Sequence, residues 1–353
     1  MGIPTEPIGS IPRPTELING IAAHAAGTIS SDELDRLYDS AVRETVERME
    51  AIGAPVISDG EQSKPSFATY PIDGSARYDG EGAVVPFADG HTRQLPRLVE
   101  GPFRYAAHAE SYLRAAGKYA SVPVKQAVIA PSLLSLLYSD EVAGYPRDAF
   151  LDDLADEAEA DIRGCLDAGA HVVQLDFTEG RLSVKLDPSK QLLGAFVDLN
   201  NRVLDRFTDE ERKRIGIHTC PGGDFDSTHS LDVDYAQLLP DLFRTHAGNV
   251  YLQLASEPEP RRVLEIAARH LNDDQRLFVG VIDPLDPRVE TPEQVRDRVL
   301  LAAEYIPVDR LGSCDDCGFS PFADDTSTTR DTAFAKIAAR IEGTALAAQQ
   351  LGL

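Results

Sequence analysis

The sequence has no tryptophan, only four cysteines and no long apolar run, and its acidic residues strongly outnumber its basic ones. The 34 Lys and Arg stand against 58 Asp and Glu, which gives a formal net charge of −24. Phosphate contact needs a basic stripe, and no Lys/Arg cluster occurs here, so nucleic acid is not an expected partner. No stretch reaches the roughly 20 apolar residues that a membrane helix requires. We therefore expect no membrane segment either.

Residues 1–13 contain no apolar run of the kind found in a signal peptide. This predicts a cytoplasmic protein, whose cysteines stay reduced. Metal binding or catalysis then becomes a better explanation than disulfides for Cys165, Cys220, Cys314 and Cys317. Hydrophobic residues make up 42% of the 353 residues, an ordinary share for a packed globular fold.

Short apolar runs alternate along the chain with longer amphipathic segments. The runs are typical of strands buried on both faces of a parallel sheet, and they span residues 5–9, 56–58, 124–129, 172–175, 215–217, 250–254, 277–282 and 310–313. The amphipathic pattern predicts helices over residues 30–49, 149–166, 192–207, 235–245, 260–271, 292–305 and 332–348. The first of these opens with Ser30 and Glu33 at capping-box spacing.

Eight strands that alternate with helices predict an α/β protein with a single (β/α)8 TIM barrel over residues 1–353. Residues 82–103 interrupt the alternation. Their two apolar runs around Asp89-Gly90 predict a β-hairpin, which we interpret as an insertion near the barrel mouth.

Reactive side chains follow several of the predicted strands. In a barrel, the loops after the strands carry the chemistry, so side chains at these places are the candidates for an active site. In chain order they include Ser10, Glu61, Asp176, His218, Cys220, Gln253, Glu257 and Cys317. A functional role is favoured for Asp176, because a carboxylate at the end of a buried strand needs a partner.

A metal centre is the most specific hypothesis from these residues. His218 and Cys220 are two apart on a strand extension, so their side chains point the same way. Cys317 follows the last strand in a Cys-x-x-Cys pair with Cys314. Thiolates combined with an imidazole favour zinc over hard cations.

Two plainer interpretations compete with a reactive zinc. Cys165, on a predicted helix, and Cys314 are suited to be small buried hydrophobic residues. Alternatively, His218, Cys220, Cys314 and Cys317 together would form a closed structural zinc site, with no open position for chemistry.

The chain resembles the catalytic barrel of the cobalamin-independent methionine synthase family, within the group that includes uroporphyrinogen decarboxylase. The similarity extends over nearly the whole chain, in the family's order. The matching segments are Ile8-Gly9-Ser10-Ile11-Pro12, Asp59-Gly60-Glu61, Pro123-Val124-Lys125, Val173-Gln174-Leu175-Asp176, Ile217-His218-Thr219-Cys220, residues 280–287 and Asp316-Cys317-Gly318.

The resemblance implies a zinc ion that binds the thiol of homocysteine, with His218, Cys220 and Cys317 as three of its ligands. The family's fourth ligand, a glutamate, falls where this chain has Gln253 or Leu254, with Glu257 a few residues further on. Gln253, Glu257 or the substrate would fill that position. The resemblance also implies that Glu61 and Asp176 hold the substrate's amino group.

The backbone of Ile8 and Ser10 matches the part of the family site that receives the substrate carboxylate. The similarity concerns the catalytic barrel alone, and the tryptophan of the family's folate site has no counterpart here. The methyl or alkyl donor is therefore left open.

These observations favour a zinc-dependent thiol alkyltransferase, with methyl transfer to homocysteine or a related thiol as the main hypothesis. Two thiolates offset the charge of the metal, which suits attack by a third sulfur better than hydrolysis. The alternatives are addition of a thiol to an epoxide or another electrophile, as in coenzyme M transferases, and a non-catalytic barrel with structural zinc.

Overall fold

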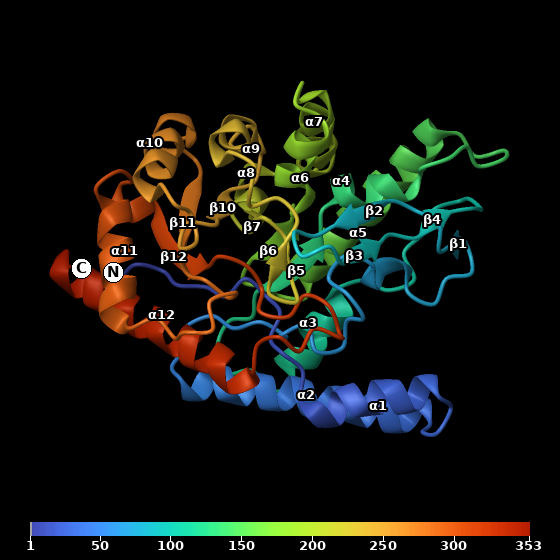
Figure 1. The fold of residues 1–353 in the computed structure, drawn as a ribbon, viewed down its shortest axis with the longest axis horizontal. Helices are drawn as coiled ribbons and strands as arrows, with labels where there is room; N and C mark the ends of the chain where they lie inside the picture. The colour runs from blue at the N-terminus through green and yellow to red at the C-terminus, as the bar shows by residue number, and fades with distance from the viewer. Residues whose placement is uncertain (1) are drawn as a thin grey trace.

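A six-stranded parallel sheet lies at the centre of the computed structural model, which describes residues 2–353, and helices pack around it (Figure 1). Strands that are neighbours in the sheet also follow one another along the chain. They are β5 (Gln126–Ile129), β6 (Val173–Asp176), β7 (Ile215–Thr219), β10 (Asn249–Leu252), β11 (Arg276–Ile282) and β12 (Leu311–Asp315). Apart from Arg276, every residue of these strands is buried. The predicted α/β class with a parallel sheet is confirmed.

Two more segments meet the edges of this sheet, each through a single bridging residue. Thr5 pairs parallel with Ser313 of β12, and Ile57 pairs parallel with Val124, just before β5. The strands predicted at 5–9 and 56–58 are therefore wrong in length. Pro7 explains part of the difference, because proline has no N–H to donate to a ladder.

Helices lie before, between and after the sheet strands along the chain. They are α1 (Thr15–Ala25), α2 (Ser31–Ala51), α3 (Glu110–Gly117), α4 (Pro131–Leu134), α5 (Arg147–Asp167), α6 (Glu179–Leu186), α7 (Gln191–Leu204), α8 (Asp209–Arg212), α9 (Leu239–Leu242), α10 (Pro260–His270), α11 (Pro292–Ala303) and α12 (Arg330–Gln350), with short 3-10 turns η1 (Tyr70–Ile72), η2 (Ser135–Leu137), η3 (Tyr235–Gln237) and η4 (Val308–Arg310). The capping box of Ser30 and Glu33 is present at the start of α2. Within residues 2–353, no helix is long and apolar enough to cross a membrane.

The pattern of predicted helices holds with two kinds of exception. The helix expected over 235–245 is divided into η3 and α9, because Pro240 cannot donate a backbone hydrogen bond and disfavours a helical residue before it. The sequence pattern did not predict α1, α3, α4, α6 or α8. Of these, α1 packs on α2 through a small cluster that includes Leu17, Leu34 and Ala41.

Residues 78–98 form two short antiparallel pairs outside the main sheet. Strand β2 (Val84–Pro86) pairs with β3 (Thr92–Gln94), and Gly90 lies in the intervening turn with a φ of 95°. The chain then leaves this pair at Pro96, and β4 (Arg97–Leu98) pairs with β1 (Tyr78–Asp79) instead. A third pair joins β8 (Gly223–Asp224) and β9 (Ser227–Thr228).

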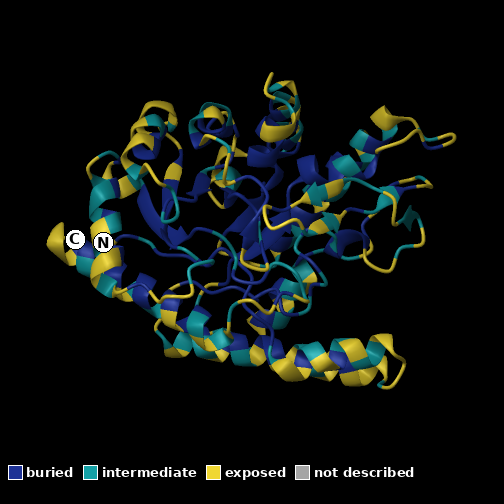
Figure 2. Ribbon diagram, in the orientation of Figure 1, coloured by how far each residue is buried: buried dark blue, intermediate teal, exposed yellow. Residues whose placement is uncertain are grey.

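The buried residues gather on the central strands and on the helix faces turned toward them, while the outer helix faces are exposed (Figure 2). Because parallel strands all run in one direction, their carboxyl ends lie along a single edge of the sheet. The segments after β6, β7, β10 and β12 therefore come together at that edge, and they carry most of the candidate site residues.

Candidate metal centre

His218, Cys220 and Cys317 form a compact group at the carboxyl edge of the sheet. One ligand atom from each lies within 4.8 Å of the others. His218 is the penultimate residue of β7, Cys220 follows that strand directly, and Cys317 comes two residues after β12. The structure thus brings together residues that are about 100 positions apart in the sequence, as their places after two strands predicted.

His218 is oriented through both of its ring nitrogens. Nδ1 lies 3.1 Å from Oδ1 of Asp176 on the neighbouring strand β6, and Nε2 lies 3.2 Å from the carbonyl oxygen of Asp316. Burial by itself lowers the pKa of the imidazole, but the hydrogen bond to Asp176, the charges of Asp176 and Cys317, and the contact with the Asp316 carbonyl together raise that pKa. A carboxylate on one ring nitrogen is the usual arrangement around zinc-bound histidine, and a metal on Nε2 would replace the contact of that nitrogen with the Asp316 carbonyl.

The two cysteine sulfurs share a short contact. Sγ of Cys220 lies 3.0 Å from Sγ of Cys317, and Sγ of Cys220 also accepts from the Gly222 N–H at 3.4 Å. The hydrogen bond between the sulfurs lowers the pKa of Cys317 and raises that of Cys220. Cys317 is therefore the first of the two to become a thiolate.

A cavity of about 380 Å³ opens beside this group. Its wall includes His218 and Cys317, and also every predicted substrate-binding residue, namely Ile8, Ser10, Glu61 and Asp176. Much of the remaining wall is apolar, with Phe67, Phe87, Leu95, Leu133, Leu182 and Phe322 among its residues. A reactive group at the base of a largely apolar cavity is the usual form of a small-molecule site.

Glu61 and Asp176 both line this cavity. Burial, with a smaller contribution from the charge of Asp176 and against the effect of Lys64, raises the pKa of Glu61 to about 7. Oε2 of Glu61 is buried without a hydrogen-bond partner. Oδ1 of Asp176 accepts a hydrogen bond from Nε2 of Gln174 at 2.7 Å and also contacts the His218 ring. Within residues 2–353, no partner is found for Oδ2 of Asp176. Each carboxyl group therefore keeps one oxygen for a ligand.

The segment Ile8 to Ser10 is fixed by its neighbours. The carbonyl of Ile8 accepts from Nε2 of Gln174 at 3.1 Å, and Oγ of Ser10 accepts from the Ser320 N–H at 3.2 Å. A Cβ on Gly318 would lie 2.2 Å from Oγ of Ser10, so this close approach requires glycine after Cys317.

The two side chains considered for a fourth ligand are both held by Arg181. Oε1 of Gln253 accepts from Nη1 of Arg181 at 3.0 Å, and Oε1 of Glu257 lies 2.5 Å from the same nitrogen. The compact group of potential ligands comprises His218, Cys220 and Cys317 and does not include Glu257. Cys314 is also outside that group: it is buried against Tyr251 and Phe278 in a separate apolar cluster.

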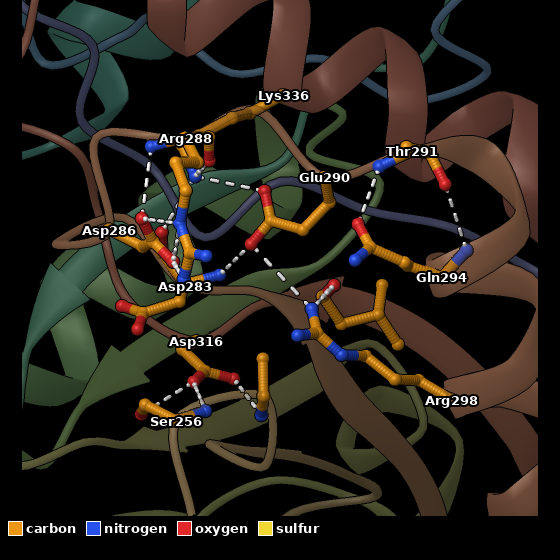
Figure 3. Close-up of polar contacts among 12 residues, drawn as sticks. Ser256, Asp283, Asp286, Arg288, Glu290, Thr291, Gln294, Arg298, Asp316 and Lys336 are labelled. Carbon is orange, nitrogen blue, oxygen red and sulfur yellow. Dashed lines mark hydrogen bonds and ion pairs between the residues drawn. The ribbon is translucent and has the colours of Figure 1, made fainter.

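Asp316, immediately before Cys317, ties the loop after β10 to the end of β12. Its Oδ1 accepts from the N–H groups of Leu254 and Ala255, both at 2.9 Å, and its Oδ2 accepts from N–H and Oγ of Ser256, both at 2.8 Å. Figure 3 shows these contacts beside a second network centred on Glu290. Burial raises the pKa of Asp316 to about 7, against the effect of these hydrogen bonds.

The second network in Figure 3 supports the loop after β11. Nζ of Lys336 is buried and donates to Oε2 of Glu290 and to the carbonyls of Asp283 and Arg288, at 2.9, 2.9 and 2.7 Å. Oε1 of Glu290 accepts from the Asp283 N–H at 2.9 Å. Nζ of Lys336 has three acceptors, and both carboxylate oxygens of Glu290 have hydrogen-bond partners. Because neither buried charge lacks a partner, this network acts as a structural support.

Sequence reasoning missed two titratable groups of the cavity wall. Glu179, at the start of α6, is buried; Oγ of Ser132 donates to its Oε1, and its Oε2 has no partner. Burial raises the pKa of Glu179 to about 8. His229 also lines the cavity, and burial lowers its pKa to about 3. The position of Glu179 three residues after Asp176, at the same strand end, was the available signal.

These features define a class: an α/β protein whose parallel strands end at a thiol-rich group of potential metal ligands beside a largely apolar, acid-containing cavity. Residues 3–339 match the family model described as cobalamin-independent synthase, catalytic domain. The chain belongs to this family, which confirms the resemblance expected from its motifs.

Known proteins similar to this chain cover almost all of it. A methionine synthase from Sulfurisphaera tokodaii is 23% identical over 350 residues, which is 99% of this chain and 94% of the relative. A methionine synthase from Saccharolobus solfataricus is 21% identical, with 99% and 96% covered. The solved B12-independent methionine synthase from Shewanella sp. W3-18-1, in complex with selenomethionine, has a similar fold, with a TM-score of 0.77, 19% identity and 99% of both chains covered.

The buried acid Glu179 generates a prediction about stability. Its pKa in the folded protein, about 8, lies above its usual 4.5. The folded chain therefore keeps a proton that the unfolded chain releases, and stability falls as pH rises between these two values. We expect Glu179→Gln to reduce this fall by up to about 1.4 kcal/mol per pH unit.

Urea unfolding of the metal-free protein at several pH values between 5 and 8 measures this slope. Glu265→Gln, a change at an exposed position of α10, is the matched control and should follow the wild type. If Glu179→Gln had the wild-type slope, Glu179 would not be a buried protonated acid.

Proposed function

We propose that this chain is a zinc-dependent methyltransferase that transfers a methyl group to the thiol of homocysteine. The observation that carries the proposal is the meeting of His218, Cys220 and Cys317 beside a cavity that also exposes Glu61 and Asp176. Membership of the cobalamin-independent synthase family, and methionine synthases similar along the whole chain, support the methyltransferase class.

The donor set fits zinc. One imidazole and two thiols are typical zinc ligands, and their atoms already lie within 4.8 Å of one another. Two sulfurs bound to one tetrahedral zinc at about 2.3 Å are roughly 3.8 Å apart. The 3.0 Å contact between Cys220 and Cys317 would therefore open slightly when their shared proton is lost. When bound, zinc lowers the pKa of a substrate thiol and keeps it as a nucleophilic thiolate at neutral pH.

The protein groups around that position recognise an amino acid. An ammonium group in a desolvated cavity needs carboxylate partners, and Oε2 of Glu61 and Oδ2 of Asp176 are free to receive it. Arrival of a cation would stabilise the charged form of Glu61, so binding near pH 7 would displace its proton. Ile8 and Ser10 remain the proposed contacts for the substrate carboxylate.

We further infer that residues 1–353 form one closed barrel, with the segments around Thr5 and Ile57 as its first two strands. Ser58 Oγ donates to the Gly9 carbonyl at 2.7 Å, which links these two segments across the gap between the edges of the sheet. The β2–β3 hairpin would then be an insertion over the mouth, since Phe87 and Arg93 line the cavity. The four free cysteines support a reducing compartment such as the cytoplasm.

Thiol addition to an epoxide, as in the coenzyme M transferases, is the second candidate. It would use the same metal group but a thiol without an amino group, so Glu61 would have no ion-pair role. A closed structural zinc is less well supported, because Cys314 lies in a separate apolar cluster. Two measurements separate these candidates.

The first prediction concerns the metal. The purified protein should hold about one zinc per chain. Cys220→Ser and Cys317→Ser should lose it on dialysis against a chelator, because each removes one of three protein ligands. Cys314→Ser, a matched change on β12, the strand that Cys317 follows, should retain it. Metal analysis by mass spectrometry gives the result.

Full zinc retention by Cys317→Ser would show that the metal site is wrongly assigned. Equal loss from Cys314→Ser would favour the closed four-ligand site instead.

The second prediction concerns the substrate. Glu61→Gln removes a charge partner of the ammonium without touching the metal group, whereas Asp176 also orients His218. Loss of one partner of a buried charge pair costs at least about 2 kcal/mol, so homocysteine should bind roughly 30-fold more weakly to Glu61→Gln. Calorimetric titration of the zinc-loaded protein measures this change.

Mercaptoethanesulfonate, a thiol without the amino group, is the control ligand, and its affinity should be nearly the same in Glu61→Gln and wild type. Tighter binding of this thiol than of homocysteine to the wild type would instead support the epoxide-type reaction.

A further inference from the structure

Arg181 controls the fourth position of the proposed metal site. We infer that its guanidinium keeps Gln253 and Glu257 away from the metal, so that His218, Cys220 and Cys317 hold the ion and the fourth position is open to the substrate thiolate. This inference rests on the proposed zinc site and adds to it the way in which this chain, which has Gln253 and Leu254 after β10, keeps that site open.

The side chain of Arg181 is held in place by the loop that follows β9. Arg181 lies on α6 and is buried, with a relative exposure of 1%. Nη2 donates to the carbonyls of Leu231 and Val233 at 2.9 and 2.7 Å, and Nε donates to Val233 at 3.2 Å. The guanidinium also lies 4.6 Å from the ring centre of Tyr235. The position of Nη1 is therefore set by the segment after β7, independently of Gln253 and Glu257.

Gln253 stands where a ligand from β10 would be expected. Tyr251 pairs with His218 and Leu252 with Thr219, so the next residue of this strand is level with Cys220. The amide oxygen is the atom that would bind a metal, and it accepts from Nη1 of Arg181 at 3.0 Å, while Nε2 donates to Oγ of Ser256 at 2.6 Å. Turning the oxygen toward the metal would leave part of a buried guanidinium without an acceptor, which is unfavourable.

Glu257 is held by both its side chain and its backbone. Its carboxylate forms a buried ion pair with Arg181, with relative exposures of 6% and 1%. The N–H groups of Leu254, Ala255 and Ser256 donate to the carboxylate of Asp316. The Glu257 N–H donates to the carbonyl of Leu254 at 3.2 Å. Binding to the metal would break this ion pair and leave Arg181 as an uncompensated buried charge.

The charges favour an open site. Two thiolates balance a divalent cation, so a neutral three-ligand group can accept a thiolate without losing a protein ligand. A carboxylate in the fourth position would make the group negative before the substrate arrives and would have to be displaced. With glutamine at 253, and with the carboxylate of Glu257 paired to Arg181, this chain avoids that competition.

Cobalt substitution tests the inference, because the visible spectrum of bound Co²⁺ reports the coordination sphere. Gln253→Ala and Glu257→Gln should each bind one Co²⁺ with the wild-type spectrum. Their zinc affinity, measured by competition with a chromophoric chelator, should change by less than about tenfold. Loss of a side chain that supports a metal site lowers the metal affinity by about 10- to 100-fold. Cys220→Ser is the positive control and should lose the spectrum.

Arg181→Met frees both side chains and should alter the spectrum before any thiol is added. If this variant does not fold, the two single variants above still decide the question. Homocysteine added to wild type should intensify the sulfur-to-cobalt absorption, and it should do so equally in Gln253→Ala and Glu257→Gln.

A spectral change, or a loss of affinity of tenfold or more, in Gln253→Ala or Glu257→Gln would overturn the inference and leave the zinc site itself intact. Absence of bound metal in the wild type would overturn both. Metal that is bound but does not respond to homocysteine would contradict the proposed substrate and the assignment of the fourth position to its thiolate.

Discussion

The carboxylate of Asp316 is the contact on which the geometry of the candidate site depends. It accepts the backbone N–H groups of Leu254, Ala255 and Ser256, and so joins the loop after β10 to the end of β12. Its own carbonyl lies 3.2 Å from the ring of His218 on β7. A Cβ at position 280 would lie 1.9 Å from Oδ1 of Asp316, so the glycine in β11 makes room for it. Four neighbouring strands therefore meet at one residue, directly before Cys317.

Burial of acids beside the metal group gives the cavity a second property. Glu61 and Glu179 have pKa values raised to about 7 and about 8, mainly because the protein removes them from water. A buried carboxyl group without a cation is more stable when protonated. The empty cavity therefore carries less negative charge than its composition indicates, and it becomes more negative when an ammonium group arrives. The proton on Glu61 thus lets the free protein tolerate a buried acid that a cationic ligand would ionise.

The meeting of His218, Cys220 and Cys317 could be predicted from the sequence, because it follows from strand geometry. His218 and Cys220 share one face of a strand extension, and the strand ends of a parallel sheet lie at one edge, which also accounts for Cys317. Helix α2 was predictable from its periodicity and from Ser30 and Glu33 at its start. The full strands expected at 5–9 and 56–58 were wrong, because apolar character does not reveal that so few of their residues pair with the sheet. Pairing depends on neighbours distant in sequence.

The role of Arg181 shows why the rest of the site could not be predicted. Its partners lie about 50 and 72 to 76 positions away, and no periodicity or spacing relates them. The sequence alone left Gln253, Glu257 and the substrate as candidates for the fourth position of the metal. The structure distinguishes them through the buried guanidinium of Arg181, whose Nε and Nη2 have fixed backbone acceptors. The remaining nitrogen, Nη1, holds the side-chain oxygens of Gln253 and Glu257. In this site, therefore, an arginine that need not touch the metal determines which atoms are free to bind it.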